Sequence, residues 1–144
     1  EKERITALEA TLFKCLFIDP EFSEKLLPYT DVFESNIGQK TLNIAFELYG
    51  LNGDFTESQV TDRLEPAESE ELIAALDKVI ITGNEKEVLK QCIHKWKFMQ
   101  LTKKEKELRN ILSLADENNK DSIDKITMEL MEIQKEMKAH GGKM

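Results

Sequence analysis

The 144-residue chain is 40% apolar and 33% charged, with a formal net charge of −8, a composition typical of a water-soluble globular protein. Its apolar runs, such as residues 16–18, are far shorter than the ~20 residues of a membrane-spanning helix, which excludes a transmembrane segment. Residues 1–83 carry 7 basic and 17 acidic side chains, and residues 84–144 carry 13 basic and 11 acidic ones. Because nucleic-acid-binding domains usually present a basic surface, this distribution argues against nucleic-acid binding by the whole chain.

The start of the chain and its two cysteines indicate the cellular environment of the protein. It begins at Glu1 without an initiator methionine and has no signal-peptide pattern, so we expect it to be part of a longer intracellular protein. Cys15 and Cys92 are far apart, and neither belongs to a CxxC or metal-type spacing. Each falls within a helical apolar pattern, which predicts two buried, reduced thiols.

Apolar residues recur every three or four positions through the first half of the chain, and no alternating strand pattern is present. The first helix is predicted over 3–18. Asp19 caps a short second helix, which Pro28 stops. Val32 and Phe33 are expected to anchor the following connector to the core.

Three more helices are predicted before the middle of the chain. The third covers 36–49 and is ended by Gly50. Thr56 and Gln59 have the spacing of a capping box, which begins the fourth helix. Pro66 opens the fifth helix. Its apolar residues are spaced for full burial on one side: Leu72, Ile73, Leu76, Val79 and Ile80.

A long helix dominates the second half of the chain. Gly83 ends the fifth helix, and Asn84 with Glu87 forms another capping box. Residues 84–116 contain neither proline nor glycine, which predicts a helix of roughly 50 Å. Residues 102–107 lack any apolar side chain, so this turn should bury nothing, and we expect any bend there. One apolar stripe precedes it and should face the bundle: Val88, Cys92, Trp96 and Met99. A second stripe follows it: Leu108, Ile111, Leu112 and Ala115.

The last predicted helix, 121–139, carries the apolar seam of a coiled coil. Its residues are spaced by 3, 4, 3 and 4 positions: Ile123, Ile126, Leu130, Ile133 and Met137. The short polar loop 117–120 favours antiparallel pairing with the end of the long helix. The prediction is therefore an all-α fold with an N-terminal helical bundle (1–100) and a C-terminal antiparallel helical hairpin (101–144), which share the long helix 84–116. We expect the hairpin to be marginally stable alone, since burying about nine apolar side chains barely offsets the entropy of ordering it.

No residue pattern indicates catalysis or a cofactor. Residues 38–41 resemble the end of a phosphate-binding loop but lack its adjacent Gly-Lys pair and its first glycine. Residues 116–121 lack the glycine that a calcium loop requires at its sixth position. Cys92 and His94 are two positions apart on a helix and face different directions. We therefore predict no catalytic residue, no metal and no cofactor.

Two stretches are candidate binding surfaces, with an ordinary solvated surface as the alternative for both. The long helix carries a basic cluster beside Trp96 and Phe98, suited to nucleic acid or an acidic partner. Its members are Lys95, Lys97, Lys103, Lys104, Lys106 and Arg109. The last helix carries a stripe that points away from its seam: Met128, Met131, Lys135 and Lys138. Flexible thioether side chains suit an adaptable protein contact.

A pattern of packing residues extends over the first half of the chain. Its pieces are Leu12-Phe13-Lys14-Cys15-Leu16, Asp19-Pro20-Glu21-Phe22, Val32-Phe33, Ala45-Phe46-Glu47-Leu48-Tyr49 with Gly53, and then Val60, Leu64 and Leu72. This pattern resembles the C-terminal helicase-binding domain of bacterial DnaG-type primases, whose layout of bundle, long helix and hairpin is similar too. The N-terminal domain of the DnaB-type replicative helicase shares the pattern and the fold. Three features favour the primase domain: Phe13-Lys14 where the helicase commonly has a small glycine, the basic long helix with its separate hairpin, and what we interpret as a natural end at 141–144.

The resemblance implies a non-catalytic domain that docks a DNA primase onto the hexameric DnaB-type helicase at the replication fork, in the bacterial cytoplasm, and modulates the helicase. The zinc-binding and primer-synthesising domains would precede it. In that family the hairpin is the main docking element, so we expect helicase contact through the outward face of the last helix: Met128, Met131, Gln134, Lys135, Met137 and Lys138. A membrane is not an expected partner, and direct nucleic-acid binding is expected to be weak. The alternatives are the helicase's own N-terminal domain, a basic-helix nucleic-acid-binding module, and a structural spacer or self-associating hairpin.

Overall fold

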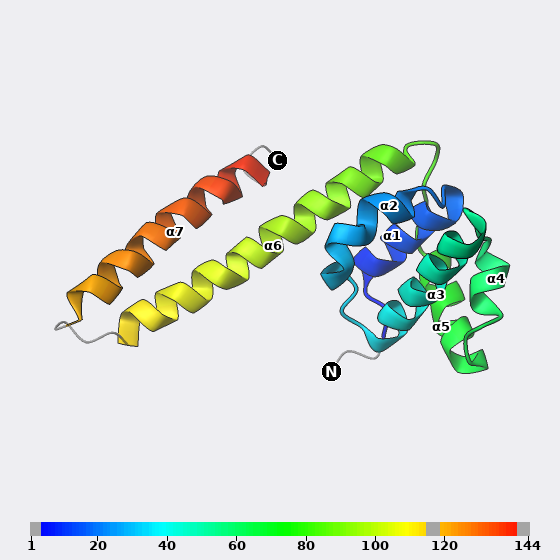
Figure 1. The fold of residues 1–144 in the computed structure, drawn as a ribbon, viewed down its shortest axis with the longest axis horizontal. Coiled ribbons are helices and arrows are strands. Elements are labelled where there is room, and N and C mark those ends of the chain that lie inside the picture. The colour runs from blue at the N-terminus through cyan, green and yellow to red at the C-terminus, as the bar shows by residue number, and fades with distance from the viewer. Residues whose placement is uncertain (1–3, 115–118, 141–144) are drawn as a thin grey trace. The chain divides into compact units, whose positions relative to one another are not determined.

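A computed structural model describes residues 4–114 and 119–140 (Figure 1). Within these ranges the chain forms seven α-helices, one 3₁₀-helix and no strand, which confirms the predicted all-α class. The chain divides into two compact units, Glu1–Cys92 and Ile93–Met144, where the sequence predicted a division after residue 100. Helix α6, Glu85–Leu114, continues through this division as a single element.

Helix α1, Ala7–Ile18, begins after the N-cap residue Thr6 and not at residue 3 as predicted. Thr6 Oγ1 accepts a hydrogen bond from Glu9 N at 3.1 Å, and the Glu9 carboxylate accepts one from Thr6 N at 3.2 Å. This reciprocal capping box satisfies two backbone N–H groups at the helix start. The predicted start was too early because Ile5 fits the helical spacing of the apolar residues. It nevertheless lies before the N-cap residue, outside the helix.

The segment after α1 contains α2, Phe22–Leu26, and the 3₁₀-helix η1, Leu27–Val32. The α-helix ends at Leu26, just before Pro28, as predicted, but the chain continues as a 3₁₀-helix and not as an irregular connector. Pro28 lies in the first turn of η1, where a residue without a backbone N–H loses no helical hydrogen bond. Val32 and Phe33 are fully buried, so their predicted role as anchors is confirmed.

Helix α3, Asn36–Asn52, is longer than predicted because Gly50 does not end it. Gly50 keeps helical geometry, whereas Gly53 adopts the left-handed conformation with φ of 70°. The Gly53 N–H donates to Tyr49 O at 2.7 Å, which satisfies a carbonyl at the helix end.

Helices α4, Glu57–Thr61, and α5, Pro66–Asp77, start where the sequence predicted. Both hydrogen bonds of the capping box that joins Thr56 and Gln59 are present. The end of α5 differs from the prediction, because the helix stops at Asp77 and residues 78–84 form a linker. Ile80 lies in this linker, so helical spacing does not determine its burial, and its side chain is 86% exposed. Ile73 lies within α5 but faces outward and is 42% exposed.

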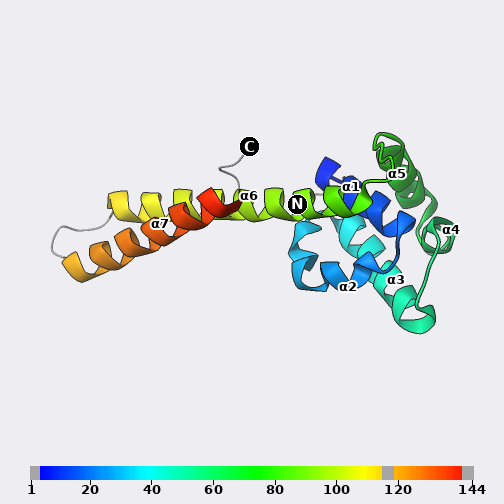
Figure 2. The ribbon, with the colours of Figure 1, turned by 90° about the horizontal axis from the view of Figure 1, so that it is seen from above.

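The core of the first unit lies between α1, α3, α5 and η1, with α1 packed against α5 (Figure 2). The Phe13 and Phe33 rings lie at its centre, with their centroids 4.8 Å apart. The start of α6 also belongs to this unit and contributes buried Leu89 and Cys92. The largest buried aliphatic side chains around the rings are Leu12, Leu16, Leu26, Leu42, Leu72 and Leu76.

The second unit pairs the later part of α6 with α7, Lys120–His140, and the two helices run in opposite directions (Figures 1 and 2). Its core consists of Leu108, Leu130 and Ile133. Four partly buried side chains pack against that core: Leu101, Leu112, Ile126 and Met137.

Helix α6 shows no break at residues 102–107, where we expected any bend. The expectation that this turn buries nothing was also wrong. Glu105 is partly buried and accepts a hydrogen bond from Gln134 of α7 at 3.2 Å. Ile111 of the predicted second stripe is 52% exposed, and Ala115 lies outside the described residues, as do positions 117 and 118 of the predicted loop.

Candidate partner-binding groove

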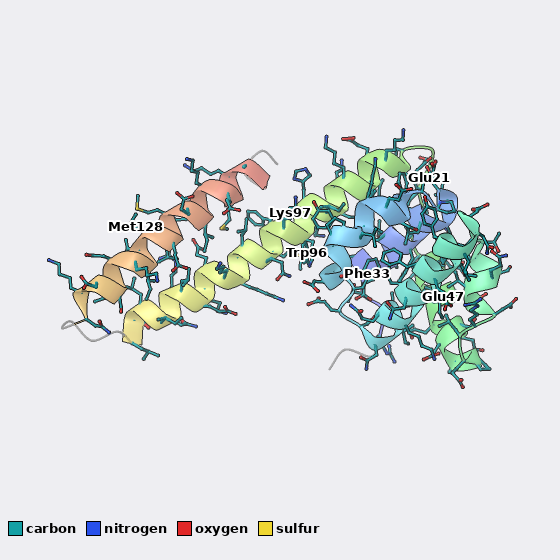
Figure 3. All side chains as sticks on the ribbon, in the orientation of Figure 1. Glu21, Phe33, Glu47, Trp96, Lys97 and Met128 are labelled. Carbon is teal, nitrogen blue, oxygen red and sulfur yellow. The ribbon has the colours of Figure 1, made fainter. Side chains whose placement is uncertain are left out.

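Helix α7 presents two chemically different faces. The face with Leu130 and Ile133 is buried against α6. Elsewhere on the helix, Met128 is 69% exposed and Met131 is 65% exposed (Figure 3 labels Met128). An exposed pair of long apolar side chains on one helix is a feature of surfaces that bind other proteins.

The two methionines line a groove of about 450 Å³ in the second unit. Ile133 lies at its base, because this residue is 4% exposed and also belongs to the core. The charged residues that line the groove are Lys104 from α6 and Lys125, Glu129, Glu132 and Glu136 from α7. The groove is therefore an apolar strip with several carboxylates along it.

The three groove glutamates form no ion pair within the described residues. They follow one another on α7 at spacings of three and four, so they lie along one side of the helix. Three carboxylates, against two lysines, lie beside the apolar strip, so the groove complements a partner that presents apolar side chains flanked mainly by lysine or arginine.

The six residues predicted to contact a partner occupy three kinds of position. Met128 and Met131 are exposed and line the groove. Lys135 and Lys138 are exposed but do not line it. The other two are engaged within the unit: Gln134 donates to Glu105, and Met137 packs against the core.

Sequence reasoning missed the charged lining of the groove. The three-and-four spacing of Glu129, Glu132 and Glu136 beside the methionines was a visible signal, because residues with this spacing share a helix face. Lys104 could not be found in this way, because its position depends on how α6 and α7 are aligned along each other.

The basic cluster of α6 lacks exposed aromatic rings on which bases could stack. Trp96 and Phe98 are partly buried, and the indole nitrogen of Trp96 is buried (Figure 3 labels Trp96 and Lys97). Arg109 pairs with Glu105 of its own helix at 3.5 Å. Single-stranded nucleic-acid sites combine cations with exposed stacking surfaces, and this helix face offers only the cations.

The start of α3, which includes residues 38–41, is occupied by a carboxylate of the chain itself. Glu9 is fully buried and accepts hydrogen bonds from Ser35 N at 2.9 Å and Ser35 Oγ at 2.6 Å. Ser35 Oγ in turn accepts from Gly38 N at 2.8 Å. Because an internal anion already satisfies this helix N-terminus, a phosphate has no place there.

The described part of the chain contains no group of three or more His, Cys, Asp or Glu side chains arranged to hold a metal. Within the same residues, no helix has both the length and the apolar character needed to cross a bilayer. Cys15 and Cys92 are both buried and are not joined in a disulfide, as predicted. Comparison with protein-family models, with curated proteins and with solved structures gave no match to this chain.

Proposed function

We propose that this chain is a non-catalytic docking domain of a replicative primase, which binds the N-terminal region of a hexameric DnaB-type helicase through α7. The observation that carries the proposal is the groove in which Met128 and Met131 lie exposed on a helix whose other face is buried. The resemblance of the packing pattern in the first unit to the primase domain supports the choice of partner.

In this proposal the helicase inserts apolar side chains beside the two methionines. Its flanking basic residues lie against Glu129, Glu132 and Glu136, which line the same groove. Burial of the apolar strip supplies most of the affinity, and the carboxylates select the partner and its orientation. The primer-synthesising domain lies in the preceding part of the primase, which the contact brings to the replication fork.

The test is a titration of the chain with the cognate hexameric helicase, followed by calorimetry. Met131→Asp should weaken binding by about tenfold or more, because it removes an apolar contact and places a charge in the groove. Ile111→Asp is the matched control. Ile111 is an exposed apolar residue of the same unit that does not line the groove, so binding should persist.

Circular dichroism of both variants checks that their helicity is unchanged. Equal loss of binding in the two variants, or no binding by the unmodified chain, would remove the proposal. If the chain is instead the helicase's own N-terminal domain, it should bind the primase and not the helicase ring. If α6 is a nucleic-acid-binding helix, affinity for single-stranded DNA should fall steeply with salt.

A further inference from the structure

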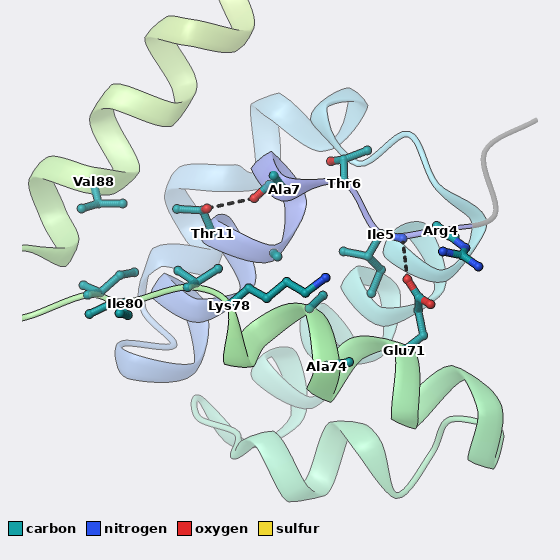
Figure 4. Close-up of a pocket in the computed structure, with 14 residues that line it drawn as sticks. Arg4, Ile5, Thr6, Ala7, Thr11, Glu71, Ala74, Lys78, Ile80 and Val88 are labelled. Carbon is teal, nitrogen blue, oxygen red and sulfur yellow. Dashed lines mark hydrogen bonds between the residues drawn. The ribbon is translucent and has the colours of Figure 1, made fainter.

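A second groove lies within the first unit, between the start of α1, the end of α5 and the linker that follows α5 (Figure 4). Its volume is about 680 Å³. Figure 4 shows the Lys78 side chain lying along the groove, with Arg4 at the end near Ile5 and Ile80 at the other end. Nothing in the proposed helicase contact uses this groove.

The groove is lined mainly by small and aliphatic side chains. Its lining includes alanines of two helices: Ala7 and Ala10 of α1, and Ala74 and Ala75 of α5. Ile80 stands at its rim and is 86% exposed, although the sequence predicted that it would be core. Small side chains on two neighbouring helices let the backbone of a third helix approach closely.

Two cations, Arg4 and Lys78, line this groove on a unit that is acidic as a whole. Residues 1–83 contain 17 acidic and 7 basic side chains, and Lys40 pairs with Glu68 and Arg63 with Glu47. Arg4 and Lys78, like Lys14 and Lys25 elsewhere in the unit, form no ion pair within the described residues.

The carboxylate within the groove does not neutralise these two cations. Glu71 accepts a hydrogen bond from Ile5 N at 3.3 Å, and no ion pair joins it to Arg4 or Lys78. The groove therefore offers an apolar surface with two available cations on an otherwise acidic unit. Its complement is an apolar surface that carries carboxylates.

We propose that this groove binds an amphipathic helix of a protein partner, which inserts aliphatic side chains between α1 and α5 and places carboxylates against Arg4 and Lys78. The occupant is a helix because the groove is bounded by two helices with small facing residues, the geometry into which a third helix packs. The α7 groove is lined by three carboxylates and two lysines, so the two grooves prefer partner segments with different charge patterns.

The probe is a fluorescein-labelled, roughly 16-residue helical peptide of alanine and leucine with glutamates flanking the leucine face, titrated with the full chain and followed by anisotropy. A matched peptide carries lysine in place of each glutamate. The glutamate peptide should bind about tenfold more tightly than the lysine peptide. Lys78→Glu should abolish that preference, and Arg4→Glu with Lys78→Glu should reverse it.

Two further variants locate the site. Ile80→Asp should abolish binding of the glutamate peptide, since it places a charge at the apolar rim. Lys90→Glu, which makes the same charge change on an exposed lysine of the first unit that does not line the groove, should leave binding intact. Met131→Asp should also leave it intact, which separates this result from the helicase test. Backbone amide shifts induced by the peptide should map to residues 4–11 and 71–82.

Three outcomes would overturn the proposal: equal or absent binding of the two peptides, binding that Ile80→Asp and Lys78→Glu do not change, or amide shifts confined to the second unit. Light scattering provides a separate check. Dimerisation of the unmodified chain that Ile80→Asp abolishes would assign the groove to a second copy of the chain and not to a partner helix.

Discussion

Two glycines of α3 illustrate how one residue type serves opposite roles. A Cβ atom added at Gly38 would lie 2.7 Å from both Glu9 Oε1 and Ser35 Oγ, the two oxygens that close the start of the helix. A Cβ added at Gly50 would meet nothing within 4 Å. Gly38 is therefore required by close packing, whereas Gly50 only raises the entropic cost of forming the helix.

Substitution of these glycines by alanine should change stability in opposite directions. Gly38→Ala should lower the free energy of unfolding by about 1–3 kcal/mol, because the buried hydrogen bonds must move apart. Gly50→Ala should raise it by about 0.5–1 kcal/mol, because alanine loses less backbone entropy in a helix. Urea denaturation followed by circular dichroism measures both. A loss in Gly50→Ala equal to that in Gly38→Ala would contradict this account.

A tyrosine of α3 gives the fold a dependence on alkaline pH. The Tyr49 hydroxyl donates a hydrogen bond to the Glu24 carboxylate. That hydrogen bond, then partial desolvation and the charges of Glu24, Glu21 and Asp19, raise the pKa of Tyr49 from 10.0 to about 12. The folded state thus favours the neutral phenol, and ionisation removes the hydrogen bond.

Tyr49→Phe should remove this pH dependence. A pKa raised by folding contributes stability that is fully present below pH 10 and is lost as the pH rises to about 12. The stability difference between wild type and Tyr49→Phe should therefore be constant below pH 10 and shrink above it. Urea midpoints across this pH range provide the measurement, and a difference that stays constant up to pH 12 would contradict this account.

At the scale of elements, the starts of α4 and α5 could be predicted from the sequence, whereas the C-terminal ends of α3 and α5 could not. Thr56 and Pro66 marked the starts of α4 and α5 correctly, because capping and proline geometry depend on neighbouring residues alone. Gly50 was predicted to end α3, but the helix continues until Gly53, because a glycine inside a helix costs only about 1 kcal/mol. Ile80 was assigned to the core because periodicity cannot show that α5 stops at Asp77.

The candidate site was partly predictable for the same reason. The exposure of Met128 and Met131 followed from helical geometry within α7. The hydrogen bond from Gln134 to Glu105 depends on the alignment of two helices, which the sequence of either helix alone does not specify. Exposure within one helix was therefore predicted, although the glutamates of α7 were missed, and contacts that depend on the alignment of two helices were not predicted.

Pairing of α7 with α6 should be the least stable part of the described structure. Leu108, Leu130 and Ile133 are the buried side chains of the described part of the second unit, whereas the first unit buries many more. Regions with few buried apolar contacts open more often. Backbone amides over 108–114 and 119–137 should therefore exchange at least about tenfold faster than those of α1 and α3. Mass spectrometry or NMR measures this, and equal protection would show that the seam is stronger than its burial indicates.

At the scale of the whole molecule, both cysteines belong to the first unit, so the reactivity of their thiols measures the opening of that unit alone. Cys15 is fully buried, and its Sγ donates to Glu85 O at 3.6 Å. Burial, followed by the nearby Cys92 and Glu85, raises the pKa of the Cys15 thiol from 9.0 to about 12. Because thiol reagents require an accessible thiolate, Cys15 should be unreactive near neutral pH until its unit opens.

Unfolding in urea should consequently not be a single transition. Helicity measured by circular dichroism should begin to fall at a urea concentration that leaves both cysteines protected from a thiol reagent, since α7 and the end of α6 separate first. Thiol labelling should follow at a higher concentration. Coincident curves for the two measurements would mean that the two units unfold together.

The buried network that joins α1 to α3 also provides a way to look for distant relatives. Thr6, Glu9, Ser35 and Gly38 are separated by 3, 26 and 3 positions, and each depends on another of the four. Loss of one residue leaves an unpaired buried group or a steric clash, so divergence is expected to keep all four or to replace them together. This spacing is a fingerprint that can be sought in chains whose overall similarity is too low to detect. In any such relative, the same carboxylate should close the starts of the helices that correspond to α1 and α3.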